Sequence, residues 1–209
     1  MVISYMGGEC FKITQGNLTL SFNPPSKDSS LKASKFGSDI VLVTNDHEDF
    51  NGVENASFGD REPFVISGPG EYEVKEVAVR GFGSETSYGG DKGINTIYSV
   101  ALEGMNLCFL GALATGDIPA SAKQELDDID ILFLPIGGDG VLDPAAAAKL
   151  AVQLEPKAVI PMHYGSVGQK DALKAFLKEA GEEVKPIEKL TVKKKDLDGK
   201  EGEIIVLES

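Results

Sequence analysis

Three short runs of consecutive apolar residues constrain the fold of this chain more than any other feature. They lie within Asp39–Thr44, Asp130–Leu134 and Ala158–Pro161. A strand that is apolar at every position is covered on both of its faces, as in sheets that lie inside a layered domain. We therefore expect three interior strands, each packed between other layers of the chain.

The first half of the chain is rich in short β-prone segments that are separated by turn residues. Glycine and asparagine between such segments are typical of a meander, and Pro24-Pro25 ends the third segment. The segment Gly81–Gly93 is rich in glycine and serine and has no periodicity, so it predicts a loop. The other predicted strands of this half are Val2–Tyr5, Cys10–Ile13, Leu18–Phe22, Phe64–Ser67, Tyr72–Val74 and Val77–Arg80.

After Asn95 the pattern changes to alternating strands and helices. Asp143 as N-cap and Pro144 at the first helical position predict a helix that reaches Leu154. Gly181 ends a second predicted helix. The remaining predictions are a hairpin of Thr96–Leu102 and Asn106–Leu110, helices over Ala120–Asp127 and Asp171–Ala180, and strands over Val184–Ile187, Leu190–Lys193 and Ile204–Leu207, with the last two paired through Asp198-Gly199.

This order of elements predicts an α/β fold in which two sheets are flanked by helices. The sequence contains no internal repeat, no low-complexity tract and no segment that resembles a linker. We therefore expect a single domain that spans residues 1–209.

The charge balance limits the partners of the chain. With 33 acidic and 20 basic side chains the formal net charge is −13, which opposes binding to nucleic acid and to anionic membrane surfaces.

No segment approaches the roughly 20 apolar residues of a membrane span. Cys10 and Cys108 lie in apolar segments and are expected to be buried thiols. We expect a cytoplasmic protein with a small-molecule ligand and without nucleic-acid or membrane partners.

The chain has two histidines, and each directly follows one of the apolar runs. His47 and Asp49 come after Val41–Thr44, and His163 comes after Val159–Met162. Imidazole and carboxylate are usual ligands of zinc and similar ions, so these three residues are candidate metal ligands. The alternative is that the histidines are hydrogen-bonded turn residues with a structural role.

Several segments, in order along the chain, resemble one known family. They are Tyr5–Phe11, Leu20–Pro24, Asp39–Phe50, Gly68–Val74, Gly93–Tyr98, Phe109–Ala112, Leu134–Gly138 and Val159–Tyr164. The chain is similar to the metallo-β-lactamase superfamily, in its small single-domain branch of L-ascorbate-6-phosphate lactonase-like and other predicted metal-dependent hydrolases. The resemblance implies an αββα sandwich, the metallo-β-lactamase-like fold of two mixed sheets flanked by helices.

The resemblance also implies a site for two metal ions, and the chain departs from its ligand pattern. Asn45 and Phe50 stand where the family has the first and last histidines of its turn, and Ala112 stands at the position of the bridging aspartate. His47, Asp49 and His163 stand at ligand positions that are retained. In the loop before Asn95, where the family has a further histidine, only Glu85 offers a ligand.

Two hypotheses follow from this pattern. In the first, the binuclear site is largely lost, no cofactor is expected, and the cleft binds a ligand without two-metal hydrolysis. In the alternative, His47, Asp49 and His163 hold one Zn, Mn or Fe ion that activates water against an ester, lactone or phosphoester. Both hypotheses leave the catalytic residues unidentified and place Glu85, Asn95 and Tyr164 at the cleft.

Overall fold

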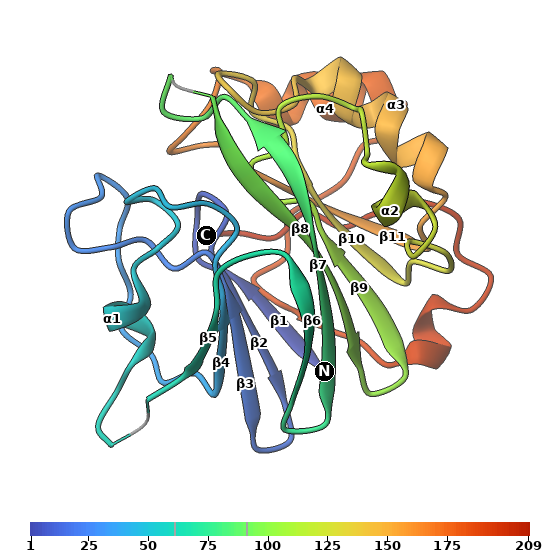
Figure 1. The fold of residues 1–209 in the computed structure, drawn as a ribbon. Helices are drawn as coiled ribbons and strands as arrows, with labels where there is room; N and C mark the ends of the chain where they lie inside the picture. The colour runs from blue at the N-terminus through green and yellow to red at the C-terminus, as the bar shows by residue number, and fades with distance from the viewer. Residues whose placement is uncertain (61, 91) are drawn as a thin grey trace.

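The computed structural model describes residues 1–60, 62–90 and 92–209, and two mixed sheets dominate it (Figure 1). The first sheet has six strands in the order β12-β1-β2-β3-β4-β5. Their bounds are β12 Leu190–Thr191, β1 Val2–Tyr5, β2 Phe11–Gln15, β3 Leu18–Phe22, β4 Ile40–Leu42 and β5 Phe64–Ile66. The pairs β3–β4 and β4–β5 are parallel, and the other neighbours are antiparallel.

The second sheet has seven strands in the order β13-β11-β10-β9-β8-β7-β6. Their bounds are β13 Glu203–Ile204, β11 Ala158–Met162, β10 Ile131–Pro135, β9 Met105–Phe109, β8 Gly93–Leu102, β7 Val77–Thr86 and β6 Gly70–Val74. Strands β13, β11, β10 and β9 are parallel to one another, and β9 to β6 form an antiparallel meander.

The three apolar runs form interior strands, as predicted. Ile40 and Leu42 of β4 pack into the large cluster between the two sheets, whereas Val41 packs with Ala56 on the outer side. In β10 the alternation is the same: Phe133 faces the other sheet, and Leu132 belongs to the cluster under the helices. Both faces of each strand are therefore buried, which explains why no polar residue interrupts these runs.

Aromatic rings fill the space between the sheets. Phe22 of β3 stacks on Phe109 of β9 with ring centroids 4.1 Å apart, and Phe11 of β2 meets Phe133 of β10 at 4.9 Å. Such contacts add to the apolar area that the two sheets remove from water. This shared core fixes the two sheets, and the loops at their ends, relative to each other.

The helices cover the outer faces of the sheets. Helices α3 (Pro144–Leu154) and α4 (Ala172–Ala180) pack on the outer side of β10 and β11 through residues such as Leu150 and Phe176 (Figure 1). The short helix α1 (Val53–Ala56) packs against β4 on the opposite outer face. The layers therefore follow the predicted αββα order. No helix in the described ranges has both the length and the apolar character that crossing a bilayer requires.

The helix ends confirm the local sequence signals. The Asp143 side chain accepts a hydrogen bond of 2.8 Å from the backbone N–H of Ala146, which caps α3. Gly181 ends α4 with a φ of +72°, a conformation that favours glycine. Helix α2 (Ala120–Lys123) is shorter than the predicted Ala120–Asp127.

Three predictions for individual segments are wrong, and the first concerns the end of β7. Of the predicted loop Gly81–Gly93, which includes the undescribed Asp91, residues up to Thr86 belong to β7. Glycine is poor in intrinsic strand propensity, but pairing with β8 holds this segment extended, and a side chain at Gly81 would meet the Gly68 carbonyl.

The predicted hairpin at the end of the chain is also wrong. Strand β12 pairs with β1, β13 pairs with β11, and a 3₁₀ turn over Lys194–Leu197 lies between them. The segment Val184–Ile187 forms no named strand and makes one isolated bridge, from Ile187 to Leu207. Each short apolar segment finds a sheet edge in another part of the chain, which a local pattern does not reveal.

Candidate functional site

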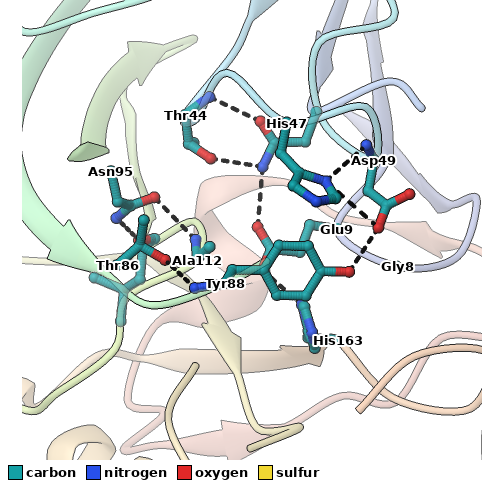
Figure 2. Close-up of polar contacts among 12 residues, drawn as sticks. Gly8, Glu9, Thr44, His47, Asp49, Thr86, Tyr88, Asn95, Ala112 and His163 are labelled. Carbon is teal, nitrogen blue, oxygen red and sulfur yellow. Dashed lines mark hydrogen bonds and ion pairs between the residues drawn. The ribbon is translucent and has the colours of Figure 1, made fainter. Parts of the chain in front are cut away.

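The site lies where loops from both sheets meet (Figure 2). The turn after β4 carries His47 and Asp49, and the residue that follows β11 is His163. Two further contributions were not predicted: Glu9 comes from the turn between β1 and β2, and Tyr88 from the connection between β7 and β8. Each side chain is therefore attached close to the end of a paired strand, which limits its freedom to move.

His163 and Glu9 form a fully buried pair. Nδ1 of His163 lies 2.8 Å from Oε1 of Glu9, and neither side chain is exposed to solvent. The backbone N–H of His163 donates to the carbonyl of Gly8 at 2.7 Å, so the backbone and the ring are both anchored to the same turn. His163 has a φ of +62°, a left-handed conformation that is uncommon outside glycine. These contacts fix the direction of the imidazole ring.

Asn23 extends this pair into a buried polar network. Its amide nitrogen donates to Oε2 of Glu9 at 2.9 Å and lies 2.8 Å from the Thr44 hydroxyl, while its amide oxygen accepts from the backbone N–H of Thr44 at 2.9 Å. Both carboxyl oxygens of Glu9 are therefore hydrogen-bonded, as a buried polar group requires. The exception in this network is Nε2 of His163, which is buried and has no hydrogen-bond partner in the described structure.

The carboxylate of Asp49 is occupied by two hydroxyl groups. Tyr88 donates its phenolic O–H to Oδ2 of Asp49 at 2.6 Å, and Ser29 donates to Oδ1. The backbone N–H of Asp49 donates to Nδ1 of His47 at 3.2 Å, and this nitrogen lies 3.6 Å from Oδ2 of Asp49. Asp49 is almost fully buried, whereas the His47 side chain is 28% exposed.

The ring of Tyr88 lies between the two histidines (Figure 2). Its centroid is 4.8 Å from that of His47 and 4.9 Å from that of His163, with interplanar angles of 69° and 89°. Burial, followed by the hydrogen bond to Asp49, raises the pKa of Tyr88 far above its usual value, so the phenol is neutral and acts as a donor.

Two of the three positions where the resemblance implied lost ligands, Phe50 and Ala112, belong to an apolar cluster. Phe50 and Ala112 are fully buried and pack with Val141 and the Tyr88 ring. The centroids of Phe50 and Tyr88 are 4.9 Å apart. Hydrocarbon around the Asp49 carboxylate raises the cost of placing an additional charge there.

Asn45 and Asn95 use their side chains to hold the loops in place. Asn45 donates to the Ile94 carbonyl at 2.9 Å. Asn95 donates to the Leu110 carbonyl at 2.8 Å and accepts from the backbone N–H of Ala112 at 2.9 Å. Both residues therefore connect the ends of β4, β8 and β9, and the amide of Asn95 is used for backbone contacts.

The other two predicted cleft residues make their side-chain or backbone contacts with other parts of the chain. Glu85 is exposed on β7, and its backbone carbonyl accepts from Ala114. Tyr164 donates its hydroxyl to the Leu207 carbonyl at 2.7 Å, and its ring lies 5.5 Å from that of Tyr5. Tyr164 thus connects the core to the C-terminal segment.

The donor atoms do not fit a metal ion in this arrangement. In the three described ranges, no group of three or more His, Cys, Asp or Glu side chains is placed to hold one. Both oxygens of Asp49 accept hydrogen bonds, and the Tyr88 ring separates His47 from His163. An ion with three protein ligands and an open coordination position requires a different arrangement.

Sequence reasoning did not identify Glu9 and Tyr88 as members of the site. The signal for Glu9 was an acid between Gly7-Gly8 and the apolar Cys10-Phe11. The signal for Tyr88 was an aromatic residue within a segment of glycine and serine. Neither signal is strong, because glutamate is mostly exposed in proteins and tyrosine is intermediate in burial.

Comparison with known proteins gives a consistent family and fold. The family described as the beta-lactamase superfamily domain matches residues 2–163. A Listeria innocua protein named as a UPF0173 metal-dependent hydrolase is 30% identical over 197 residues, covering 79% of this chain and 86% of that protein. A Natranaerobius thermophilus protein with the same family name is 26% identical and covers 79% and 84%.

Solved structures share the fold. A Thermotoga maritima protein named as a Zn-dependent hydrolase of the metallo-β-lactamase superfamily superposes with a TM-score of 0.78 at 24% identity, covering 99% of this chain and 97% of that one. The metallo hydrolase Igni18 from Ignicoccus hospitalis superposes with a TM-score of 0.64 at 17% identity, covering 99% and 94%. At these identities the likeness establishes the architecture alone.

Proposed function

This chain belongs to the metallo-β-lactamase superfamily, and from that premise we propose that it is a ligand-binding member of the fold without two-metal hydrolysis. One observation carries the proposal. Tyr88 takes the position between His47 and His163 and donates its hydroxyl to Asp49, so a side chain of the protein occupies the space among the retained ligand residues.

The chemistry of the surrounding residues supports this proposal. Two metal ions at about 3.5–4 Å need a bridging group, and the side chain at that position is the methyl group of Ala112. Phe50 offers a hydrocarbon ring where a donor atom would be needed. Replacing donors with apolar groups removes the charge complementarity on which a binuclear centre depends.

We further propose that the ligand is a small molecule that enters beside the partly exposed His47. The net charge of −13 favours a role without nucleic-acid partners or contact with anionic membranes, and we propose a cytoplasmic location. Residues 1–209 act as one domain in this proposal, because a single apolar cluster joins the two sheets.

A second candidate function is the hydrolase with one metal ion, and the names of the Listeria and Natranaerobius relatives favour it over the first. The unpartnered Nε2 of His163 also favours it, because a metal-binding histidine usually has a carboxylate on its other nitrogen, as Glu9 is here. His47, Asp49 and His163 would hold a Zn, Mn or Fe ion, which polarises an ester, lactone or phosphoester when bound. This function requires Tyr88 to leave its position.

Metal content separates the two functions. Tag-free protein is incubated with Zn(II), Mn(II) or Fe(II), desalted and measured by mass spectrometry. The ligand-binding function predicts less than about 0.1 equivalent of each ion per chain. The one-metal hydrolase predicts uptake of one equivalent that is lost in His47→Ala and in His163→Ala. This uptake would be kept in Asp117→Ala, which changes an exposed acid elsewhere. Such a result would overturn the ligand-binding function.

A further inference from the structure

The contacts of Tyr88 resemble those of a bound ligand. Its hydroxyl donates at 2.6 Å to a nearly buried carboxylate, that of Asp49. Its ring meets the rings of His47, His163 and Phe50 at centroid distances of 4.8–4.9 Å. Two of the rings and the carboxylate come from the turn after β4, and the third ring, that of His163, comes from the end of β11, so two loops far apart in the sequence form an enclosure around this one side chain.

The enclosure matches the chemistry of a phenol in detail. A phenol has an apolar ring with one strong O–H donor, and it needs aromatic or aliphatic contacts around the ring and one acceptor at its end. Phe50, Ala112 and Val141 supply the apolar contacts, and Asp49 supplies the acceptor. Ser29 holds the second oxygen of Asp49, which directs the first oxygen toward the phenol.

The backbone that carries Tyr88 lies outside the sheet. Strand β7 ends at Thr86, and the two residues after Tyr88 are glycines with φ values of +83° and +95°. The backbone N–H of Tyr88 donates to the Thr86 hydroxyl, and Ser87 donates to the Gly140 carbonyl at 3.3 Å. The backbone of Ser87 and Tyr88 also packs closely on Gly140, and the Tyr88 side chain adds a further attachment of this segment to the site.

We propose that the centre formed by His47, Asp49, Phe50 and His163 is a binding site for a phenolic ring, which Tyr88 fills from within the chain. The inference rests on the proposed ligand-binding function and names its ligand class. Because Tyr88 is tethered next to the site, it competes at a high effective concentration against an external phenol. Removing its side chain therefore opens the site.

Phenol itself is the probe, because Tyr88→Ala removes the hydroxyphenyl group of the side chain and leaves its β-carbon in place. We expect saturating phenol to raise the unfolding midpoint of Tyr88→Ala by at least about 3 °C more than that of the wild type. Benzene, which has no hydroxyl, is expected to give less than half of this rise. Tyr72→Ala, which loses a tyrosine whose hydroxyl bonds to Gly68 and Pro69 at the surface, is the matched control and should gain nothing.

Folding of the variant does not limit the test. If Tyr88→Ala is unfolded in buffer, recovery of its far-ultraviolet circular dichroism on addition of phenol is the expected result, since a ligand of the folded state draws the chain into it. Equal effects of phenol on Tyr88→Ala and Tyr72→Ala, or equal effects of phenol and benzene, would overturn the proposal.

The same protein separates this inference from the proposed function. Tyr88→Ala is also measured for zinc. If phenol does not stabilise Tyr88→Ala and neither protein takes up zinc, the phenol site is overturned and the ligand-binding function stays in place. Uptake of one equivalent of zinc by wild type and variant overturns both. Uptake by the variant alone overturns the phenol site, because the opened centre then selects an ion.

Discussion

Oε1 of Glu9 lies 2.8 Å from Nδ1 of His163, although the two residues are 154 positions apart and both are fully buried. The pair joins the turn between β1 and β2 to the end of β11, one from each sheet. It therefore connects the two layers at the site with polar groups, next to the apolar core that joins them elsewhere.

Replacing Glu9 with leucine tests the importance of this pair. Removing one partner of a buried pair leaves the other, together with the Asn23 amide, without its acceptor, so we expect a loss of about 3–5 kcal/mol in the free energy of unfolding. Glu9→Gln keeps an acceptor oxygen and should lose less. Urea unfolding measures both, with the exposed Glu85→Gln as control, expected within about 0.5 kcal/mol of wild type. Equal losses in all three variants would contradict the prediction.

Tyr88→Phe removes one hydroxyl and keeps the ring. The carboxylate of Asp49 then retains Ser29 as its hydroxyl donor, and we expect a loss of about 1–2 kcal/mol at pH 7. The loss is measured from the shift of the urea unfolding midpoint, provided that the dependence of the free energy of unfolding on urea concentration is the same in both proteins. Tyr72→Phe is the control for a surface hydroxyl. An unchanged midpoint would show that the bond to Asp49 does not stabilise the fold.

The contribution of the Tyr88 hydroxyl should depend on pH in one direction. The pKa of this phenol is raised in the folded state, first by burial and then by Asp49, above its usual value near 10. Its contribution is therefore complete below about pH 10 and is lost as pH rises above this value, because the unfolded chain releases its proton first.

The slope of this loss is at most about 1.4 kcal/mol per pH unit, and the total loss is reduced because Tyr88 is partly exposed and solvent screens its interactions. Urea unfolding of wild type and Tyr88→Phe between pH 8 and 11 measures it as the difference between the two proteins. A difference that stays constant above about pH 10 would argue against the hydrogen-bonded neutral phenol.

Restoring donor atoms should restore metal binding. The triple variant Phe50→His, Ala112→Asp, Tyr88→Ala places an imidazole and a carboxylate beside Asp49 and His163 and removes the intervening ring. We expect it to take up about one equivalent of zinc, measured by mass spectrometry after desalting. The matched control Phe50→Leu, Ala112→Ser, Tyr88→Ala has the same opening without new donors. If neither variant takes up zinc, the positions of the loops exclude the ion even when donor side chains are restored.

The two cysteines should be inert in the native protein. Burial raises the pKa of Cys10 to about 12 and raises that of Cys108 as well, so almost no thiolate forms at pH 8. We expect reaction with an aromatic disulfide reagent at least about 100-fold slower than in guanidinium, where both thiols react. One thiol that reacts at the unfolded rate would reveal an exposed conformation.

Much of the fold could be predicted because its signals are local. Consecutive apolar residues identified β4, β10 and β11, and the acid before a proline identified the start of α3. The last residues of β7 were missed, and the predicted strands at β12 and β13 were paired with each other, whereas their partners β1 and β11 lie elsewhere in the chain. Strand propensity depends strongly on such partners.

The site could be predicted only in part. His47, Asp49 and His163 were found from their position after apolar runs, and the structure places them around a common side chain. That side chain, Tyr88, has no pattern in its own segment that indicates it. Its role follows from its distance to residues on other strands, as does that of Glu9.

The pairing of β1 with β12 affects the order in which the chain can fold. Val2 lies opposite Thr191, so the outer neighbour of the first strand is made after all the other strands of its sheet. Contacts of such high sequence separation slow folding, because the intervening chain must be ordered before they form. A nascent chain therefore carries β1 as an open edge until β12 has been made, and in this interval the edge is exposed to unwanted pairing with other chains.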